Sequence, residues 1–183
     1  MAYTDTDGPL LTCEKIPYLA PHPPCYRGAM RIYVHVPSQT LDLLDGDTVV
    51  RRYVVSTSRF GLGSEAGSNK TPTGRFRIAE KHGDDAEPGM IFVSRESTGA
   101  FGKPDDPKDH VQTRILWLEG LEPGNANTYE RYVYIHGTNA EGKLGVPASE
   151  GCVRMNNDDI VDLYERVEPG TEVTIDSGEQ PEA

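Results

Sequence analysis

Short segments that alternate apolar and polar residues constrain the fold of this chain more than any other feature. Residues 30–36, Met-Arg-Ile-Tyr-Val-His-Val, have the two-residue period of a half-buried strand. Residues 40–44 form a second apolar segment, followed by Asp45-Gly46, a strong signal for a tight hairpin turn. The valine-rich residues 48–56 then supply a returning strand. The domain is therefore predicted to open as a β-meander.

The rest of the chain predicts more short strands and one helix. The expected strands are residues 75–79, 91–94, 113–118, 131–136 and 172–175. A helix is predicted at about residues 156–167, because Asn156 can act as its N-cap and an apolar stripe follows at helical spacing. Many strands with one late α-helix indicate a mainly β fold, either a β-sandwich or a partly closed barrel.

The chain divides into three parts by composition. Residues 1–28 form an irregular, proline-rich leader, residues 29–176 form the domain, and residues 177–183 form a polar tail. A chain of 183 residues with 36% hydrophobic residues is long enough for one core, and a second domain is not required. The glycine-containing loop at 57–74 is long for a connector, and its composition leaves a functional and a merely solvated role equally open.

Charge and hydropathy exclude some partners and leave the location conditional. A net charge of −11 without a basic stripe argues against nucleic acid or an anionic membrane surface as a partner. No run of eighteen apolar residues exists, so no membrane span is expected. Residues 1–28 do not resemble a secretory signal. We therefore expect a cytoplasmic protein if the chain is complete, and a periplasmic or cell-envelope protein if a signal was removed.

The three cysteines do not suggest a disulfide framework or a metal site. Cys13 and Cys25 lie in the leader and are interpreted as incidental or packed thiols, while Cys152 has no obvious partner. No Cys-x-x-Cys or His-x-x-x-His spacing is present, and we therefore expect neither a metal nor another cofactor.

A histidine and a cysteine sixteen positions apart suggest catalysis. His136 ends a predicted strand in Ile-His-Gly-Thr-Asn, and Cys152 follows a glycine in Ser-Glu-Gly-Cys-Val-Arg-Met. A thiol is mostly protonated at neutral pH, so a neighbouring imidazole is the usual way to activate it. Gly137 lets the chain turn after the histidine, and Gly151 gives the backbone freedom to aim amides at an oxyanion. A single histidine or cysteine is more often structural, but the two strings together favour an enzyme.

These residues resemble the catalytic domain of the L,D-transpeptidases (the YkuD-type fold). The family's hallmark is His-Gly-Thr, a variable connector, and Ser-x-Gly-Cys-x-Arg, which here are residues 136–138 and 149–154. The resemblance extends over about residues 30–175 and includes Thr-Pro-Thr-Gly at 71–74. It implies an L,D-transpeptidase-like β-sandwich or partly closed barrel with a cysteine nucleophile.

The resemblance also implies roles for individual residues. Cys152 would attack the bond before the terminal D-alanine of a peptidoglycan tetrapeptide stem, forming a thioester. His136 would serve as the base, oriented by a backbone carbonyl near Gly137. The amides of Gly151 and Cys152 would bind the oxyanion. The residues assigned to substrate binding are Arg154, Ser149 and Tyr134. For Arg154, bracing of the cysteine loop is an equally good interpretation.

Two features of the sequence differ from this expectation. The residue before Gly-Cys is often histidine in the family, and here it is Glu150, a carboxylate that would tend to raise the thiol pKa. The substrate's carboxylates also require a locally basic groove in an acidic protein. The cations considered for it are Lys70, Arg75, Arg95, Arg114 and Arg154. Trp117 is expected in the core, although it could line the cleft.

The resemblance leaves the acceptor open. An amine from a neighbouring stem would give transpeptidation, whereas water would give an L,D-carboxypeptidase of muropeptide recycling, which suits a chain without a signal. A non-catalytic muropeptide-binding module is a third hypothesis, which an intact His136 and Cys152 argue against. Carbapenem-type inhibitors, which acylate the family, are expected to bind.

Overall fold

The alternating segments form a β-sheet in the computed structural model, which describes residues 29–104 and 106–178. Its strands are β1 (Met30–His35), β2 (Thr40–Asp45), β3 (Thr48–Ser56), β4 (Gly74–His82), β5 (Met90–Val93), β6 (Glu96–Phe101), β7 (Val111–Gly120), β8 (Tyr134–Gly137), β9 (Val153–Met155) and β10 (Glu172–Asp176). A short 3-10 helix, η1 (Glu141–Lys143), and the helix α1 (Asn157–Arg166) complete the regular structure of this part of the chain.

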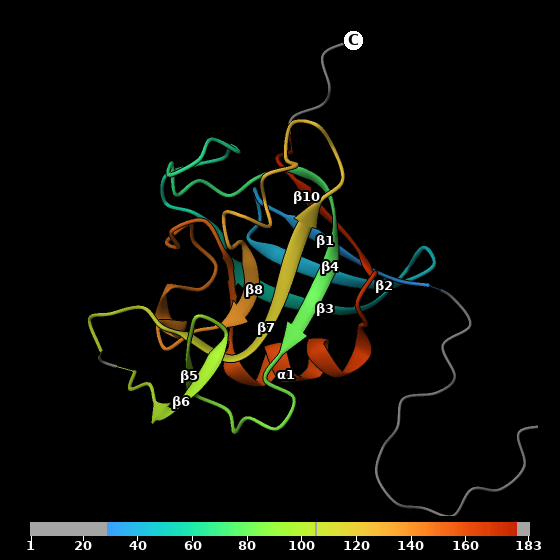
Figure 1. The fold of residues 1–183 in the computed structure, drawn as a ribbon. Coiled ribbons are helices and arrows are strands. Elements are labelled where there is room, and N and C mark those ends of the chain that lie inside the picture. The colour runs from blue at the N-terminus through green and yellow to red at the C-terminus, as the bar shows by residue number, and fades with distance from the viewer. Residues whose placement is uncertain (1–28, 105, 179–183) are drawn as a thin grey trace, which may run out of the picture.

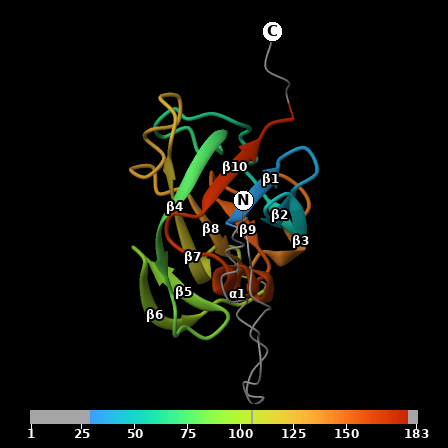
Figure 2. The ribbon, with the colours of Figure 1, turned by 90° about the vertical axis from the view of Figure 1, so that its right-hand side faces the viewer.

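The sheet closes on itself. Its strand order is β4-β10-β1-β2-β3-β9-β8-β7, and β7 then pairs with β4 to complete a ring. β5 and β6 extend from the same β7 as a hairpin outside the ring, which Figure 2 shows beside α1. Closure leaves the ring strands without free edges. The predicted mainly β fold with one late helix is therefore confirmed, and the closed ring makes it a barrel.

The buried apolar side chains form two clusters, a main one and a smaller one. Ile32 and Val34 of β1 point into the main cluster, as the two-residue alternation predicted. β7 is buried on both faces, because Leu116 and Leu118 join the main cluster while Ile115 and Trp117 join a second, smaller one. The second cluster also contains Phe92 and Tyr134, and Cys152 packs against it. The expected core position of Trp117 is confirmed.

The helix α1 lies across one end of the barrel (Figure 1). The Asn156 side chain accepts hydrogen bonds from the backbone N–H groups of Asp158 and Asp159, as expected of an N-cap. Ile160 and Leu163 lie on the side of α1 that is buried in the main core. The helix begins and ends within one residue of the predicted bounds.

The structure differs from the predicted strands in three places. β9 was not predicted, because it has only three residues and all of them are buried, so no alternation marks it. β6 was missed because all six of its residues are exposed, so no buried alternation marks it. The expected strand at 131–136 begins only at Tyr134, since Tyr132 takes a positive φ of 57° in a turn. Val133 and Ile135 still enter the core, as the alternation predicted.

Some expectations concern residues outside the described part of the chain. These are the leader at 1–28 with Cys13 and Cys25, and most of the polar tail, residues 179–183. Within residues 29–104 and 106–178, no helix is long and apolar enough to cross a membrane.

Candidate active site

Two adjacent parallel strands bring the predicted histidine and cysteine to one cavity. β8 pairs with β9 so that Ile135 lies opposite Val153, and His136 lies opposite Arg154. Cys152 immediately precedes β9 and therefore lies at the beginning of the strand beside the histidine. His136 and Cys152 both line a cavity of about 410 Å³.

The backbone sets the tautomer of His136. Its Nδ1 lies 2.7 Å from the carbonyl oxygen of Gly137. Because a carbonyl can only accept a hydrogen bond, Nδ1 carries the proton and Nε2 of the neutral ring keeps its lone pair. Burial lowers the pKa of His136, and this effect outweighs the opposing influences of the Gly137 carbonyl and Asp109. The ring is therefore neutral at neutral pH, with Nε2 available to accept a proton.

The thiol of Cys152 is protonated in the resting site. Burial raises its pKa to about 11, although the backbone N–H of Tyr134 donates to Sγ at 3.4 Å and favours the thiolate. The thiol in turn donates to the carbonyl oxygen of Tyr132 at 3.5 Å. With His136 also neutral, the resting site contains an uncharged thiol and an uncharged imidazole.

Two glycines are required by this geometry, for different reasons. A Cβ at Gly137 would lie 2.9 Å from the backbone oxygen of Gln112 on β7, too close for any side chain. Gly151 has a φ of 122°, a conformation that side-chain-bearing residues rarely adopt. The positive φ sets the direction of the peptide groups immediately before Cys152.

The turn that carries Cys152 is held by two hydroxyl groups. The Ser149 Oγ donates to the Cys152 carbonyl oxygen at 2.6 Å and accepts from the Gly151 N–H at 3.3 Å. The Thr71 Oγ1 donates to the Gly151 carbonyl oxygen at 3.0 Å. Ser149 is buried, so the structure places this predicted substrate-binding residue within the turn, where its hydroxyl holds the backbone around Cys152.

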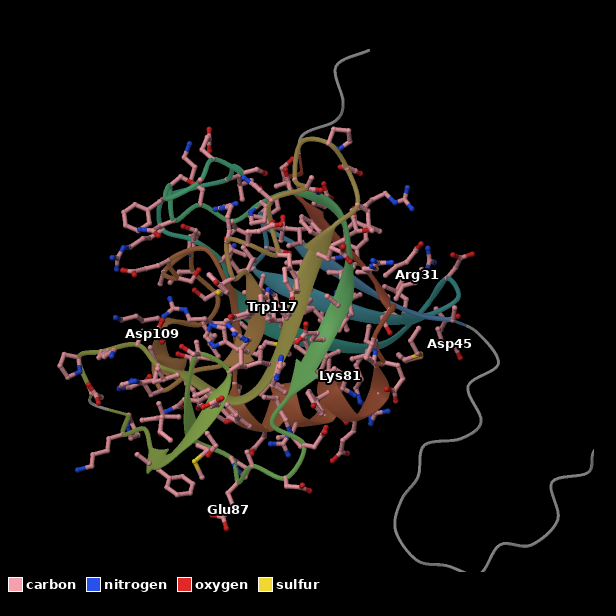
Figure 3. The ribbon with its side chains drawn as sticks, in the orientation of Figure 1. Arg31, Asp45, Lys81, Glu87, Asp109 and Trp117 are labelled. Carbon is pink, nitrogen blue, oxygen red and sulfur yellow. The ribbon has the colours of Figure 1, made fainter. Side chains whose placement is uncertain are left out.

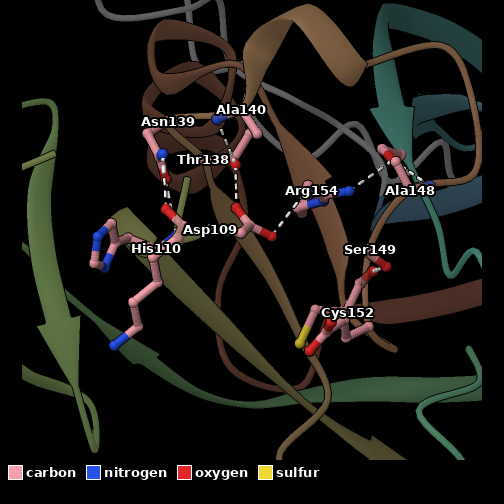
Figure 4. A network of polar contacts seen from close by, with 12 residues as sticks. Asp109, His110, Thr138, Asn139, Ala140, Ala148, Ser149, Cys152 and Arg154 are labelled. Carbon is pink, nitrogen blue, oxygen red and sulfur yellow. Dashed lines mark hydrogen bonds and ion pairs between the residues drawn. The ribbon is translucent and has the colours of Figure 1, made fainter. Parts of the chain in front are cut away.

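Arg154 is also buried, with 2% of its surface exposed, and its charge is paired inside the protein. Its Nη1 lies 2.6 Å from Asp109, whose other carboxylate oxygen accepts a hydrogen bond from Thr138 Oγ1 at 2.6 Å (Figure 4). Of the two roles considered for Arg154, the geometry supports bracing. Asp109 was not identified from the sequence, because it belongs to no motif and lies in a polar loop.

Glu150 lines the same cavity as Cys152, but its charge is paired with an arginine. Its carboxylate forms an ion pair of 2.5 Å with Arg59, and its side chain is more than half exposed. Burial is the main cause of the raised thiol pKa, and Asp109 is a carboxylate that adds to it, opposed by Arg154.

The cations of the cavity differ from those considered in the sequence. Only Arg154 of that set lines it, whereas Arg75 pairs with Glu172 where β4 runs beside β10. Lys108 and Lys143 also line the cavity, and neither has an ion-pair partner among the described residues. Their segments carry no motif, so only the folded structure could reveal them.

Tyr134 contributes its backbone to the sulfur and its ring to the second cluster. The ring is 8% exposed and meets Trp117 edge to face, with ring centroids 5.6 Å apart. Arg95, at the turn between β5 and β6, lies over Trp117 at 4.5 Å from the ring centre. The aromatic cluster thus supports the strand from which the Tyr134 amide reaches Cys152.

Cys152 also lines a second cavity of about 310 Å³, with Asn69, Arg131, Tyr132 and Gly151 among its other residues. Cys152 therefore lines two cavities, and of these two only the larger is also lined by His136. In the described part of the chain, no group of three or more His, Cys, Asp and Glu side chains is placed to hold a metal ion.

Comparisons with known proteins show the family of this domain. The family model of the L,D-transpeptidase catalytic domain (YkuD) matches residues 29–175. The L,D-transpeptidase homologue YkuD of Bacillus subtilis (strain 168) is 27% identical over 153 residues, covering 84% of this chain and 70% of its own. YcfS of Escherichia coli (strain K12), another homologue, is 28% identical over 129 residues, covering 66% of this chain and 37% of its own.

A solved structure gives the same fold. The crystal structure of L,D-transpeptidase 3 from Mycobacterium tuberculosis superimposes with a TM-score of 0.52 at 20% identity, covering 81% of this chain and 60% of that chain. The barrel with its paired histidine and cysteine segments is that of an L,D-transpeptidase catalytic domain. The chain belongs to this family. It spans little more than a third of the length of YcfS, so it corresponds to part of that relative.

Proposed function

We propose that this protein is a cysteine acyltransferase acting on the tetrapeptide stem of peptidoglycan, with Cys152 as nucleophile and His136 as base. The observation that carries the proposal is the cavity shared by the two residues, in which the Gly137 carbonyl holds the proton on Nδ1 and leaves Nε2 free. Membership in the L,D-transpeptidase family supports this substrate class.

In the first step, Cys152 attacks the carbonyl carbon of the bond before the terminal D-alanine. The sulfur–carbon bond forms as the thiol proton passes to Nε2 of His136, so no free thiolate is required from a thiol whose pKa is about 11. The carbon–nitrogen bond then breaks, and the same proton leaves on the amine of D-alanine. The products are a thioester on Cys152 and free D-alanine.

The oxyanion of this step needs donors near the sulfur. We assign the role to the backbone amides of Gly151 and Cys152, and the positive φ of Gly151 supports this because it sets the direction of these peptide groups. The Gly151 N–H would exchange its 3.3 Å contact with Ser149 Oγ for the oxyanion. The Tyr134 amide, which already donates to the sulfur, is a further donor at the same place.

In the second step, an amine of a neighbouring stem attacks the thioester. The new carbon–nitrogen bond forms, the carbon–sulfur bond breaks, and His136 transfers the amine's proton back to the sulfur. The second cavity supports an amine acceptor, because it gives Cys152 an opening separate from the one it shares with His136. Water in place of the amine would give the carboxypeptidase reaction.

The donor stem carries carboxylates, and the larger cavity supplies cations for them. Lys108 and Lys143 line it without an ion-pair partner among the described residues, so their charges are available to a ligand. This local positive charge would let the cavity bind an anionic substrate although the net charge of the protein is −11. Arg154, whose charge is paired with Asp109, is left to brace the site.

Carbapenem-type compounds are proposed as covalent inhibitors. The neighbouring structures include L,D-transpeptidase 3 of Mycobacterium tuberculosis with a faropenem-derived adduct and LdtMt1 in complex with imipenem. The Cys152 sulfur would attack the carbonyl carbon of the strained lactam ring, as in the first step. The ring carbon–nitrogen bond would break, and the inhibitor would stay attached to the sulfur.

The test is incubation with a disaccharide-tetrapeptide, with and without a second stem, followed by mass analysis. We expect release of D-alanine together with a cross-linked dimer, whereas release of D-alanine with water added to give the tripeptide, and no dimer, would identify a carboxypeptidase. Cys152→Ala should abolish release of D-alanine, and undiminished release would exclude this nucleophile. His136→Ala should remove most activity and slow acylation by imipenem, and normal acylation would exclude it as the base.

A further inference from the structure

One carboxylate outside the family motifs connects the histidine segment to the cysteine segment. Asp109 lies just before β7, and its two oxygens contact two different partners at once. One accepts from Thr138 Oγ1 and the other from Arg154 Nη1, each at 2.6 Å. Figure 4 shows the carboxylate between these two side chains. Both contacts are short, as expected where an ionised carboxylate is the acceptor.

The partners of Asp109 have matching positions relative to the reacting residues. Thr138 is two residues after His136, and Arg154 is two residues after Cys152. Since β8 and β9 are parallel neighbours, Asp109 holds the strands that carry both groups at the same end. A change at this carboxylate is therefore transmitted to the imidazole and to the sulfur together.

The two partners of Asp109 are buried, while the carboxylate itself is partly exposed. Thr138 is completely buried and Arg154 is 2% exposed. The remaining contact of the guanidinium is a long one, 3.4 Å from Nη2 to Ser56 Oγ, and its Nε has no partner within the described residues. Asp109 is thus the principal partner of a buried charge, and that charge cannot move to water if the carboxylate is lost.

We propose that Asp109 is a positioning residue of this site, which fixes the histidine and cysteine segments relative to each other through Thr138 and Arg154. It does not touch the reacting atoms. Its proposed effect is to keep the Gly137–Thr138 peptide, and therefore the carbonyl that orients His136, in one place while β9 is held by the same carboxylate. The inference rests on the proposed function, because it names a residue that serves that reaction.

The charge of Asp109 gives the proposal a second, independent readout. Asp109 raises the pKa of both His136 and Cys152, and Arg154 lowers both. The other charged or titratable groups that line this cavity are Arg59, Lys108, His110, Lys143 and Glu150, and none changes in the variants below. Removing only the charge of Asp109 leaves Arg154 unopposed, so both pKa values should fall.

The test compares Thr138→Val, Thr138→Ser and Asp109→Asn with the wild type. Thr138→Val keeps the size of the side chain and the Arg154–Asp109 pair but loses the hydroxyl, and we expect kcat about 10- to 100-fold lower with KM nearly unchanged. The midpoint of the pH profile should not move, because no charge has changed. Thr138→Ser restores the hydroxyl and should recover most of kcat. A Val variant with wild-type kcat, or a Ser variant as slow as the Val variant, would overturn the proposal.

Asp109→Asn should lower kcat and also shift the acid limb of the pH profile to lower pH. The pH dependence of iodoacetamide alkylation of Cys152, mapped by peptide mass so that Cys13 and Cys25 are counted separately, should shift in the same direction. Unchanged midpoints would contradict the role of Asp109. If Asp109→Asn does not fold in a melting experiment, the Val and Ser pair decides. If the wild type releases no D-alanine, the proposed function fails, and the alkylation midpoints still test Asp109.

Discussion

Burial gives both reacting side chains of the proposed mechanism a resting charge of zero. It raises the pKa of Cys152 to about 11 and lowers that of His136, so a thiolate–imidazolium pair is disfavoured at neutral pH. The reaction must then transfer the proton as the sulfur attacks. The proposed reaction is then one of general base catalysis, in which the nucleophile forms only when the substrate is present.

This arrangement predicts the pH dependence. His136 must be neutral to act as the base, so activity falls only as pH drops through its lowered pKa. We expect an acid limb of kcat/KM with a midpoint below about 6.5, the ordinary value for histidine. Without substrate, alkylation of Cys152 by iodoacetamide should be slow at pH 7 and increase toward a midpoint at about 11. A thiol that titrates near neutrality would indicate a preformed ion pair and contradict this account.

A second prediction at the residue scale concerns the unpaired lysines. Changing Lys108 and Lys143 together to Gln should raise KM for the tetrapeptide about 10-fold, with a smaller effect on kcat, because the charges attract the bound carboxylates before and during reaction. The dependence of KM on salt should weaken in the same variant. Lys103→Gln, at an exposed lysine in the same loop that does not line the cavity, is the control. An unchanged KM would show that the carboxylates bind elsewhere.

At the scale of elements, the loop at 57–74 holds the segment that carries Cys152. Ser58 forms a bridge with Ser149, and the Ser58 N–H donates to Thr71 Oγ1 at 2.9 Å, the hydroxyl that also holds Gly151. Composition left its role open, and the contacts favour the functional interpretation. Such contacts join positions about eighty residues apart, which a local pattern cannot reveal.

Removal of the Thr71 hydroxyl tests this role of the loop. Thr71→Val would leave the Ser58 N–H and the Gly151 carbonyl without their shared partner at a fully buried position. We expect the free energy of unfolding to fall by about 1–3 kcal/mol, as for other unsatisfied buried groups, and D-alanine release to slow. Urea unfolding and kinetics on the same preparations are the measurements. Thr71→Ser keeps the hydroxyl and should retain most of the activity, and equal losses in both variants would assign the effect to the methyl group.

The elements also show what the sequence could and could not predict. Alternation found β1, the apolar segments on either side of the Asp45-Gly46 turn found β2 and β3, and the cap at Asn156 found α1, because each signal depends on neighbouring residues. β6 has no buried face and carries no such signal. The motifs identified His136 and Cys152, whose shared cavity the structure shows, but Asp109 and the lysines lie near them only after β7, β8 and η1 pack together. Polar contacts between distant segments are therefore the part that sequence reasoning missed.

At the scale of the whole molecule, the active site is built on the same closed sheet that contains the core. β8 and β9 lie within the ring, and β7 connects β8 to β4, where the ring closes. Phe76 of β4 is fully buried next to this closure and pairs with Val173 on one side and Gly120 on the other. If β4 and β7 separate, β8 and β9 should therefore unfold in the same cooperative transition, with no populated intermediate.

The single tryptophan makes this cooperativity measurable. Trp117 is buried on β7 and is labelled near the middle of the view in Figure 3. In urea, its fluorescence, the far-ultraviolet circular dichroism and the release of D-alanine should all be lost in one transition. Phe76→Ala should shift all three equally, by about 3–5 kcal/mol, since it leaves a cavity in the core. Val93→Ala, at a residue 60% exposed on β5, should shift none. Activity lost at a lower urea concentration than fluorescence would mean that β8 and β9 separate from the barrel before it unfolds.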